Sequence, residues 1–333
     1  MKKRNTRSIS FIALALPLLM IGSLPASADY SYQMIGPPGG LFSNAWGNNN
    51  AGMVAGQYSD GISDLSFIYD MKRGEYRTID SGFLVYGISN NGVMVGDVDG
   101  VCAIRDKKGN ITEFYPPSFG PGSICIARAV NSNDKVSGFL IDNVGGWLGF
   151  IYDSRHGTYE EFLPSLGQTI AQGINAQGEN VGSVVLDESE AYEGSLPGRY
   201  GYLREADGSV KYFGINQGFP DDATARGISD SGLVTGFYLD QVTFEYKSYV
   251  TTLSSGTEFE NIELTDDQMV HVSPCDSDLE EPPPGYEAGS DVFAQQIRND
   301  GVVVGTCQDY FIRFEPFDFF YVNSFGFIAT PIK

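Results

Sequence analysis

Six aspartates recur at nearly the same distance after a glycine that closes a repeated phrase of the sequence. Carboxylates that converge on one point can bind Ca²⁺ or another hard cation, and they attract cationic or polyhydroxyl ligands. The alternative is that each Asp accepts hydrogen bonds from the backbone of its own turn, as Asp commonly does. The predicted ligand-binding set, which is also the metal set if calcium binds, is Asp60, Asp99, Asp142, Asp187, Asp240 and Asp309.

The repeated phrase is twelve residues long and occurs six times. Its copies end 40, 42, 44, 54 and 69 residues apart, which indicates insertions in the later units. Repetition at this length predicts an architecture built from one supersecondary unit. The copies are AWGNNNAGMVAG, VYGISNNGVMVG, ARAVNSNDKVSG, AQGINAQGENVG, ARGISDSGLVTG and AQQIRNDGVVVG.

Each unit predicts four strands. The phrase reads as one hairpin, because a short β-like run, a polar turn and a Val-rich run follow each other. A second hairpin follows in most units, as in residues 149–153 and 158–164. Four strands in about 40 residues are typical of a propeller blade. We therefore expect an all-β fold, a six-bladed β-propeller of four-stranded antiparallel blades, with a right-handed β-solenoid as the alternative.

The expected ring positions the aspartates and the insertions. Small residues such as Ala45 and Gly47 indicate that the first strand of each blade is innermost, where neighbouring blades crowd together. The loops between second and third strands then open on one face, so the aspartates are expected around one mouth of the central channel. Either residues 30–35 or residues 318–332 would complete the last blade and close the ring. Two inserted segments, 187–199 and 261–291, add candidate binding loops.

On these motifs the chain resembles the HAF-type extracellular repeat family of bacterial exported proteins. Repeats of that family carry a G-I-N-x-x-G-x-V-V-G core followed by an H-A-F-L-Y-like strand, and the resemblance spans the mature chain. It implies an extracytoplasmic, propeller-like repeat protein and carries over no activity. The family's His is replaced here by Leu65, Cys102, Leu148, Tyr200, Lys247 and Tyr310.

The N-terminus and the cysteines indicate export. Residues 1–28 read as a secretory signal peptide, with a basic start, a short apolar stretch and an Ala-Ser-Ala cleavage pattern. The mature chain, 29–333, is expected to be a single propeller domain that is secreted, periplasmic or on the bacterial cell surface, with no transmembrane segment after signal cleavage. An even number of cysteines in an oxidising compartment favours disulfides, with free thiols as the alternative. Of the three possible pairings we favour Cys102–Cys125, which joins units two and three, and Cys275–Cys307, which ties the long insert to the last unit.

Composition restricts the function further. The formal net charge of −21 repels phosphate backbones, so nucleic acid is excluded as an expected partner. The two histidines, His156 and His271, lie in a turn and in the insert. Their positions therefore predict neither a His metal cluster nor a Ser-His-Asp triad. Exposed aromatic residues could stack on sugars, although packing between blades explains them as well. These aromatic residues are Trp46, Tyr86, Trp147, Tyr192 and Tyr200.

The sequence therefore predicts an exported, monomeric, non-catalytic binding or interaction module. Its partner would be a small molecule, a glycan or a protein, with a cation or glycan at the channel mouth and Ca²⁺ as the one cofactor considered. The first alternative is a secreted carbohydrate-active hydrolase that uses two of the same carboxylates. The second is a purely structural envelope protein.

Overall fold

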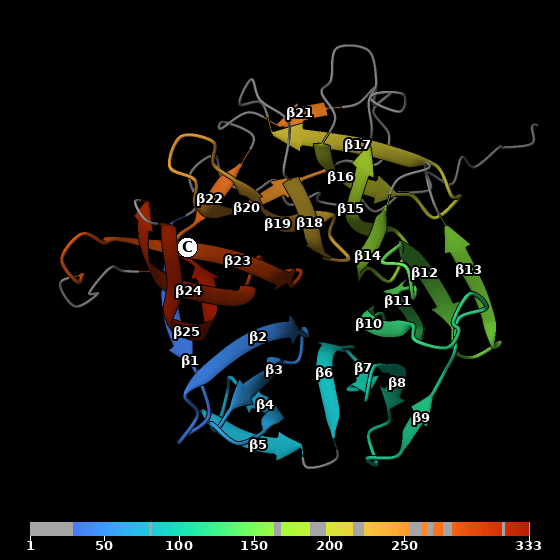
Figure 1. Cartoon of the computed structure of the whole chain (residues 1–333). Helices are drawn as coiled ribbons and strands as arrows, with labels where there is room; N and C mark the ends of the chain where they lie inside the picture. The colour runs from blue at the N-terminus through green and yellow to red at the C-terminus, as the bar shows by residue number, and fades with distance from the viewer. Residues whose placement is uncertain are drawn as a thin grey trace, which may run out of the picture.

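The computed structural model describes residues 29–79, 82–162, 168–186, 198–215, 223–253, 262–264, 269–275, 282–314 and 317–332. Within these residues all regular secondary structure is β, and six sheets are arranged radially around a central axis (Figure 1). The predicted six-bladed propeller is confirmed. No helix in the described ranges is long and apolar enough to cross a membrane. The predicted signal peptide lies outside the described residues.

The first three blades are simple meanders that run outward from the channel. Blade 1 contains β2 (Phe42–Asn48), β3 (Met53–Ser59), β4 (Asp64–Asp70) and β5 (Glu75–Ile79). Blade 2 contains β6 (Phe83–Ile88), β7 (Met94–Val98), β8 (Val101–Arg105) and β9 (Ile111–Glu113). Blade 3 contains β10 (Ile124–Val130), β11 (Lys135–Ile141), β12 (Trp147–Asp153) and β13 (Thr158–Phe162).

The chain of blade 5 contributes one short strand to the perimeter of blade 4. Blade 4 contains β14 (Thr169–Ile174), β15 (Asn180–Leu186), β16 (Gly198–Arg204) and β17 (Val210–Ile215). Blade 5 contains β18 (Ala223–Ile228), β19 (Leu233–Leu239), β20 (Tyr246–Thr252) and β22 (Val270–Val272). Between β20 and β22 the chain forms β21 (Ile262–Leu264), which pairs in parallel with β17. This described part of the second predicted insert thus extends the outer edge of blade 4.

Both ends of the chain complete the sixth blade. It contains β23 (Glu287–Ile297), β24 (Val303–Phe314), β25 (Phe317–Pro331) and β1 (Tyr30–Ile35), in the order β1-β25-β24-β23. β1 pairs antiparallel with β25, from Tyr30 opposite Pro331 to Ile35 opposite Gly326, and the two strands lie side by side in Figure 1. The N-terminal segment is therefore the outermost strand and the C-terminal segment the third, so the two candidate closing segments are both used.

Small residues allow the innermost strands to pack closely, as predicted. A Cβ atom added to Gly47 would lie 3.0 Å from Gly87 Cα of the next blade, and one added to Gly87 would lie 2.7 Å from Arg128 O. The glycine that closes each phrase meets a tighter limit, because its added Cβ would lie 1.8 to 2.4 Å from a carbonyl oxygen of the innermost strand. These closing glycines are Gly56, Gly96, Gly138, Gly182, Gly236 and Gly305.

Two disulfides fasten neighbouring parts of the ring. Cys102 in β8 is bonded to Cys125 in β10, so blades 2 and 3 are joined covalently. Cys275, which follows β22, is bonded to Cys307 in β24 of blade 6. Both predicted pairings are confirmed.

Candidate functional site

Each innermost strand contains one β-bulge at the equivalent position. In blade 1, for example, the pairing register of β2 and β3 shifts between Ala45 and Gly47, so Trp46 has no partner in β3. Bulges redirect the side chain of the extra residue, and they are common beside functional sites. We call the six bulged residues the channel set. They are Trp46, Tyr86, Arg128, Gln172, Arg226 and Gln295.

Contacts across the ring show that the channel set converges on the axis. Arg128 of blade 3 donates from Nη2 to Gln295 Oε1 of blade 6, at 3.1 Å. Because blades 3 and 6 are three positions apart in a ring of six, this bond crosses the channel. Arg128 also donates from Nε to Gln172 Oε1 of blade 4, at 2.8 Å. Its guanidinium carbon lies 4.5 Å from the ring centroid of Trp46 and 5.0 Å from that of Tyr86.

Arg128 therefore connects five blades from the middle of the channel. The rings of Trp46 and Tyr86 are themselves in edge contact, with centroids 5.3 Å apart. A guanidinium held over aromatic rings away from bulk water is stabilised by about 2 kcal/mol. Burial lowers the pKa of Arg128 to about 10, so this residue stays protonated at neutral pH.

Two donors of the channel set have no hydrogen-bond acceptor among the described residues. They are the indole Nε1 of Trp46 and the Nε of Arg226, and both atoms are buried. The Arg226 guanidinium lies over the ring of Phe237, with its central carbon 4.8 Å from the ring centroid. Burial, followed by the charges of Arg128 and Arg199, lowers the pKa of Arg226 well below its usual value. The channel interior is thus electropositive in a protein whose net charge is −21.

The channel set offers hydrogen-bonding groups. Guanidinium, amide and indole groups donate or accept hydrogen bonds, but they do not exchange protons near neutral pH. The nearby carboxyl group of Asp97 is 6% exposed and accepts a hydrogen bond from Gly100 N at 3.0 Å. Burial raises the pKa of Asp97, and burial together with Asp97 raises the pKa of Tyr86.

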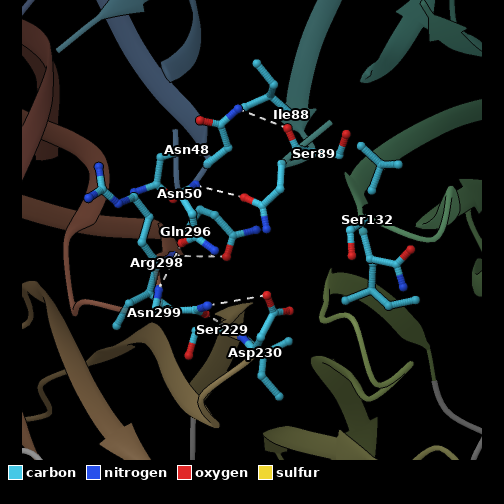
Figure 2. Close-up of a pocket in the computed structure, with 17 residues that line it drawn as sticks. Asn48, Asn50, Ile88, Ser89, Ser132, Ser229, Asp230, Gln296, Arg298 and Asn299 are labelled. Atoms are coloured by element: carbon cyan, nitrogen blue, oxygen red, sulfur yellow. Dashed lines mark hydrogen bonds between the residues drawn. The ribbon is translucent and has the colours of Figure 1, made fainter. Parts of the chain in front are cut away.

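The turns between the first and second strands of the blades surround one end of the channel. They border a small open hollow of about 50 Å³ whose lining includes Asn50, Asn90, Ser132, Asp230 and Asn299. Figure 2 shows side chains from these turns directed at one another around this hollow. The repeated Asn and Ser residues of the phrase therefore come together at one mouth of the ring.

These turn residues form a continuous belt of hydrogen bonds between blades. The belt runs through Asn49 Nδ2 to Ser89 O (2.9 Å), Asn91 Nδ2 to Ser132 O (2.8 Å), Asn131 Nδ2 to Asn175 O (2.8 Å), Asn175 Nδ2 to Ser229 O (3.3 Å), Asp230 N to Asn299 Oδ1 (2.9 Å) and Asn299 N to Asn50 Oδ1 (3.3 Å). Every blade is thus bonded to the next, and blade 6 to blade 1. Because their polar groups bond to neighbouring blades, we interpret this end as a structural clasp.

Three of the predicted aspartates cap their own turns. Asp60 accepts from Ile62 N and Ser63 N at 2.9 and 2.8 Å, and Asp142 accepts from Val144 N and Gly146 N at 2.9 and 2.7 Å. Asp240 accepts in the same way from Val242 N and Thr243 N, at 2.8 and 3.0 Å. These bonds match the local-turn alternative.

The environments of these carboxylates differ in their effect on pKa. Hydrogen bonds from Ser63 N and Ile62 N lower the pKa of Asp60. Burial alone would raise the pKa of Asp240, but its ion pair with Lys247 and its two backbone bonds lower it to about 2.

The other three predicted aspartates are placed differently. Asp99 lies in the turn between β7 and β8, where its φ of 51° is in the left-handed region. Asp309 lies within β24, is 8% exposed and accepts from Ser290 Oγ at 2.7 Å. Asp187 lies outside the described residues.

The predicted binding of Ca²⁺ by the six aspartates remains a prediction. Among the described residues, the ligand atoms of Cys275, Cys307 and Asp309 form one group of three within 4.8 Å of one another, and no other such group of His, Cys, Asp or Glu occurs there. Because the two cysteines are joined in a disulfide, they offer no thiolates to a metal.

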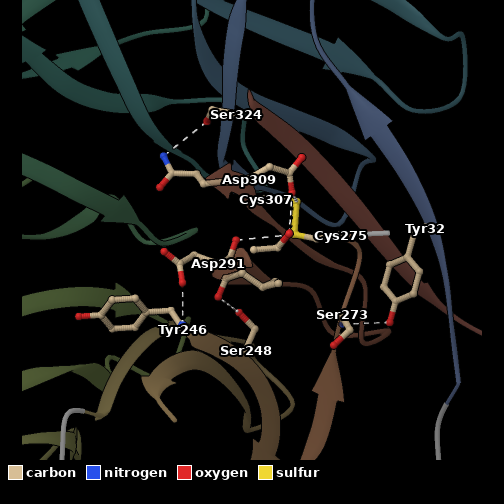
Figure 3. The surroundings of a disulfide bond; sticks show 12 residues. Tyr32, Tyr246, Ser248, Ser273, Cys275, Asp291, Cys307, Asp309 and Ser324 are labelled. Atoms are coloured by element: carbon tan, nitrogen blue, oxygen red, sulfur yellow. Dashed lines mark hydrogen bonds between the residues drawn. A yellow bond between two sulfur atoms is a disulfide. The ribbon is translucent and has the colours of Figure 1, made fainter. Parts of the chain in front are cut away.

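A buried carboxyl group lies beside this disulfide (Figure 3). Asp291, in β23, is 6% exposed and accepts a hydrogen bond from Tyr246 N at 2.8 Å. Burial, with a smaller effect of the Glu245 charge, raises the pKa of Asp291 to about 6. Sequence reasoning did not single out this residue, because nothing in its local sequence distinguishes it from a solvated aspartate.

Sequence reasoning recognised the channel set only in part. It named Trp46 and Tyr86 as aromatic residues that could contact sugars, but it did not identify Arg128, Gln172, Arg226 and Gln295 as their equivalents. The signal was present, because each of these residues lies between two residues that pack against neighbouring strands. One large or polar side chain at a fixed place in a phrase of small residues marks the position that faces the channel.

The chain has distant likenesses among solved structures. No protein family and no curated protein matches the chain. Among solved structures it is similar to an oligogalacturonate lyase in complex with manganese, with a TM-score of 0.46 and 9% identity over 92% of this chain and 97% of that one. It is similar to virginiamycin B lyase from Staphylococcus aureus, with a TM-score of 0.46 and 10% identity over 91% and 100% of the two chains. The β-propeller domain of a trilobed protease from Pyrococcus furiosus gives 0.43 and 14% over 81% and 82%. Likenesses of this strength carry no argument about this chain.

Proposed function

We propose that this protein is an exported, non-catalytic binding module that takes a small ligand or a glycan unit in its central channel. The observation that carries the proposal is the channel set, six bulged residues that converge from six blades and include two buried donors with no acceptor in the described part of the chain. Buried polar groups nearly always have a hydrogen-bond partner, so an unpaired buried donor points to a missing acceptor. A ligand oxygen would supply it.

Export is supported by the N-terminal signal pattern and by two disulfides, which persist in oxidising compartments. The resemblance to HAF-type repeat proteins agrees with this location. Both disulfides also stabilise the ring, so the channel residues are held by a rigid frame. A rigid frame favours binding, because little order has to be created when the ligand enters.

The two tryptophans of the chain allow a direct test. Trp46 lies in the channel, whereas Trp147 is stacked on Phe139 in blade 3, with ring centroids 5.2 Å apart. In a Trp147→Phe protein, Trp46 is the remaining tryptophan, and its emission reports events in the channel. We expect a glycan and metabolite screen of this protein to give saturable changes in Trp46 emission for at least one compound.

A matched pair of variants identifies the site. Trp46→Phe keeps an aromatic ring beside Arg128 but removes the unpaired N–H donor, so binding measured by calorimetry should weaken about tenfold. Trp147→Phe removes an indole elsewhere and should leave the affinity unchanged. Equal affinities for Trp46→Phe and the wild type would contradict a site in the channel.

One observation favours the alternative of a carbohydrate-active hydrolase. Asp291, with a pKa of about 6, and Asp240, with a pKa of about 2, lie in neighbouring blades 5 and 6, and paired carboxyl groups with separated pKa values can act as acid and base. Turnover of a polysaccharide panel that is lost in both Asp291→Asn and Asp240→Asn would support the hydrolase over a binding module.

A further inference from the structure

The channel contains cationic side chains that no carboxylate of the described residues neutralises. Neither Arg128 nor Arg226 forms an ion pair with any residue of that part of the chain. Arg128 is satisfied by the amide oxygens of Gln172 and Gln295 and by two aromatic rings. Arg226 has an aromatic support on one face, and its buried Nε has no acceptor within the described ranges.

We propose that the channel ligand carries an oxyanion, a carboxylate or sulfate group, and that this group binds to the guanidinium of Arg226. This assignment rests on the proposed function, in which the channel is the binding site. It specifies the chemical class of the ligand, whereas the proposed function specifies only its place.

The geometry of Arg226 suits this role. A guanidinium presents its N–H donors in a planar fork that matches the two oxygens of a carboxylate or sulfate. The Phe237 ring at 4.8 Å covers one face of the guanidinium, and Phe237 is itself held by Phe293 and Tyr246, with ring centroids at 4.9 and 5.6 Å. The orientation of the fork is therefore fixed before a ligand arrives.

The electrostatic environment of Arg226 points the same way. A buried charge without a counter-charge is unfavourable, and neighbouring charges of the same sign increase the cost. Burial together with the charges of Arg128 and Arg199 lowers the pKa of Arg226, which agrees with such a cost. An anion in the channel would offset it, whereas a cation would increase it. The channel interior and the outer aspartate turns therefore favour ligands of opposite charge.

The first experiment uses chemically matched probes on the Trp147→Phe protein. Glucuronate and glucose differ by one carboxylate, and sodium sulfate is compared with sodium chloride at equal ionic strength. We expect glucuronate and sulfate to change Trp46 emission saturably and to raise the melting temperature, while glucose and chloride do neither. Glucuronate and glucose that behave alike would overturn the assignment without any variant being made.

The second experiment tests the residue. Arg226→Gln should weaken glucuronate or sulfate binding about 10- to 100-fold, because a hydrogen bond to a charged group is lost. Arg226→Lys keeps the charge but loses the fork, and it should bind with intermediate affinity. Arg73→Gln removes the same charge from an exposed turn and serves as the control for a general field effect. Anion affinity that is equal in Arg226→Gln and Arg73→Gln would refute the role of Arg226.

The outcomes separate this inference from the proposed function. A neutral compound that binds in a Trp46-dependent manner, with no effect of Arg226→Gln, would support the channel as the binding site and contradict an anionic ligand. A complete lack of response of Trp46 to anions and to the wider screen would contradict both the channel site and the anionic ligand.

Discussion

Replacing Asp291 with Asn should make the protein more stable at neutral pH and leave it unchanged in acid. The Asp291 carboxyl group is 6% exposed, and burial raises its pKa from 3.8 to about 6. It faces Glu245, whose charge raises the pKa further, and the hydroxyl groups of Tyr310 and Tyr321, whose own pKa values it raises. Asn retains an oxygen that can accept the hydrogen bond from Tyr246 N.

The size and sign of the effect follow from proton linkage. Between about pH 4 and pH 6 the folded protein holds a proton on Asp291 that the unfolded chain has lost, so the free energy of unfolding falls as the pH rises through this window. A shift of about 2 pKa units corresponds to roughly 3 kcal/mol at 1.36 kcal/mol per unit. For a domain of ~300 residues with an unfolding entropy of about 2.1 cal/mol/K per residue, this is about 5 °C in melting temperature.

The assay is the melting temperature of wild type and Asp291→Asn from pH 3.5 to pH 8. We expect the two curves to coincide near pH 3.5 and to separate by about 5 °C above pH 7. Asp60→Asn is the control of opposite sign, because hydrogen bonds lower the pKa of Asp60. The wild-type Asp60 carboxylate therefore stabilises the fold at neutral pH, and this stabilisation is lost as the pH falls. A constant offset between Asp291→Asn and wild type at every pH would refute the reasoning.

Two further substitutions test the frame around the channel. Asn131→Ala removes a buried side chain that donates to Asn175 O and accepts from Asn133 N and Lys135 N, so we expect a loss of about 2 to 3 kcal/mol in urea unfolding. The exposed Asn133→Ala should cost less than about 1 kcal/mol, and equal losses would show that the belt contributes little. Gly96→Ala would place a Cβ 1.8 Å from Leu84 O and should cost about 4 kcal/mol or more, whereas Gly120→Ala, with no atom within 4 Å, should stay within about 0.5 kcal/mol of the wild type. Circular dichroism melts of the two glycine variants check this difference.

The fold could be predicted from the sequence because its constraints are local and repeated six times. The close approach of Gly47 to the next blade and the contact of Gly96 with Leu84 O leave little room for a larger side chain, so small residues recur at these positions, with Gln296 of blade 6 as an exception. Turn residues recur for a similar reason, since Asn131 both caps its own turn and reaches the next blade. The strand order of blades 1 to 4 then follows from the repeat, and the ring favours the two disulfide pairings.

The site could be predicted less well, because its chemistry depends on environment. Asp60 and Asp291 are the same residue type, but one accepts backbone bonds on the surface and the other is buried, so their pKa values shift in opposite directions. Ring closure was undecided for a related reason. β1 and β25 both have strand-like sequences, and only the register between Tyr30 and Pro331 assigns them to different positions in one blade.

The channel set is not visible as a repeated residue in the sequence, because its six members differ. The phrase repeats where packing allows few side chains, and it varies at the bulge, where the side chain faces the channel and packing imposes no common size. Each unit can therefore contribute a different group to one shared space without disturbing the sheet that carries it. Under the proposed function, this variable position determines which ligand binds. Arg226 differs from Gln172 at that position while their strands remain equivalent. Exchanging bulge residues between blades should consequently alter ligand preference more than it alters stability.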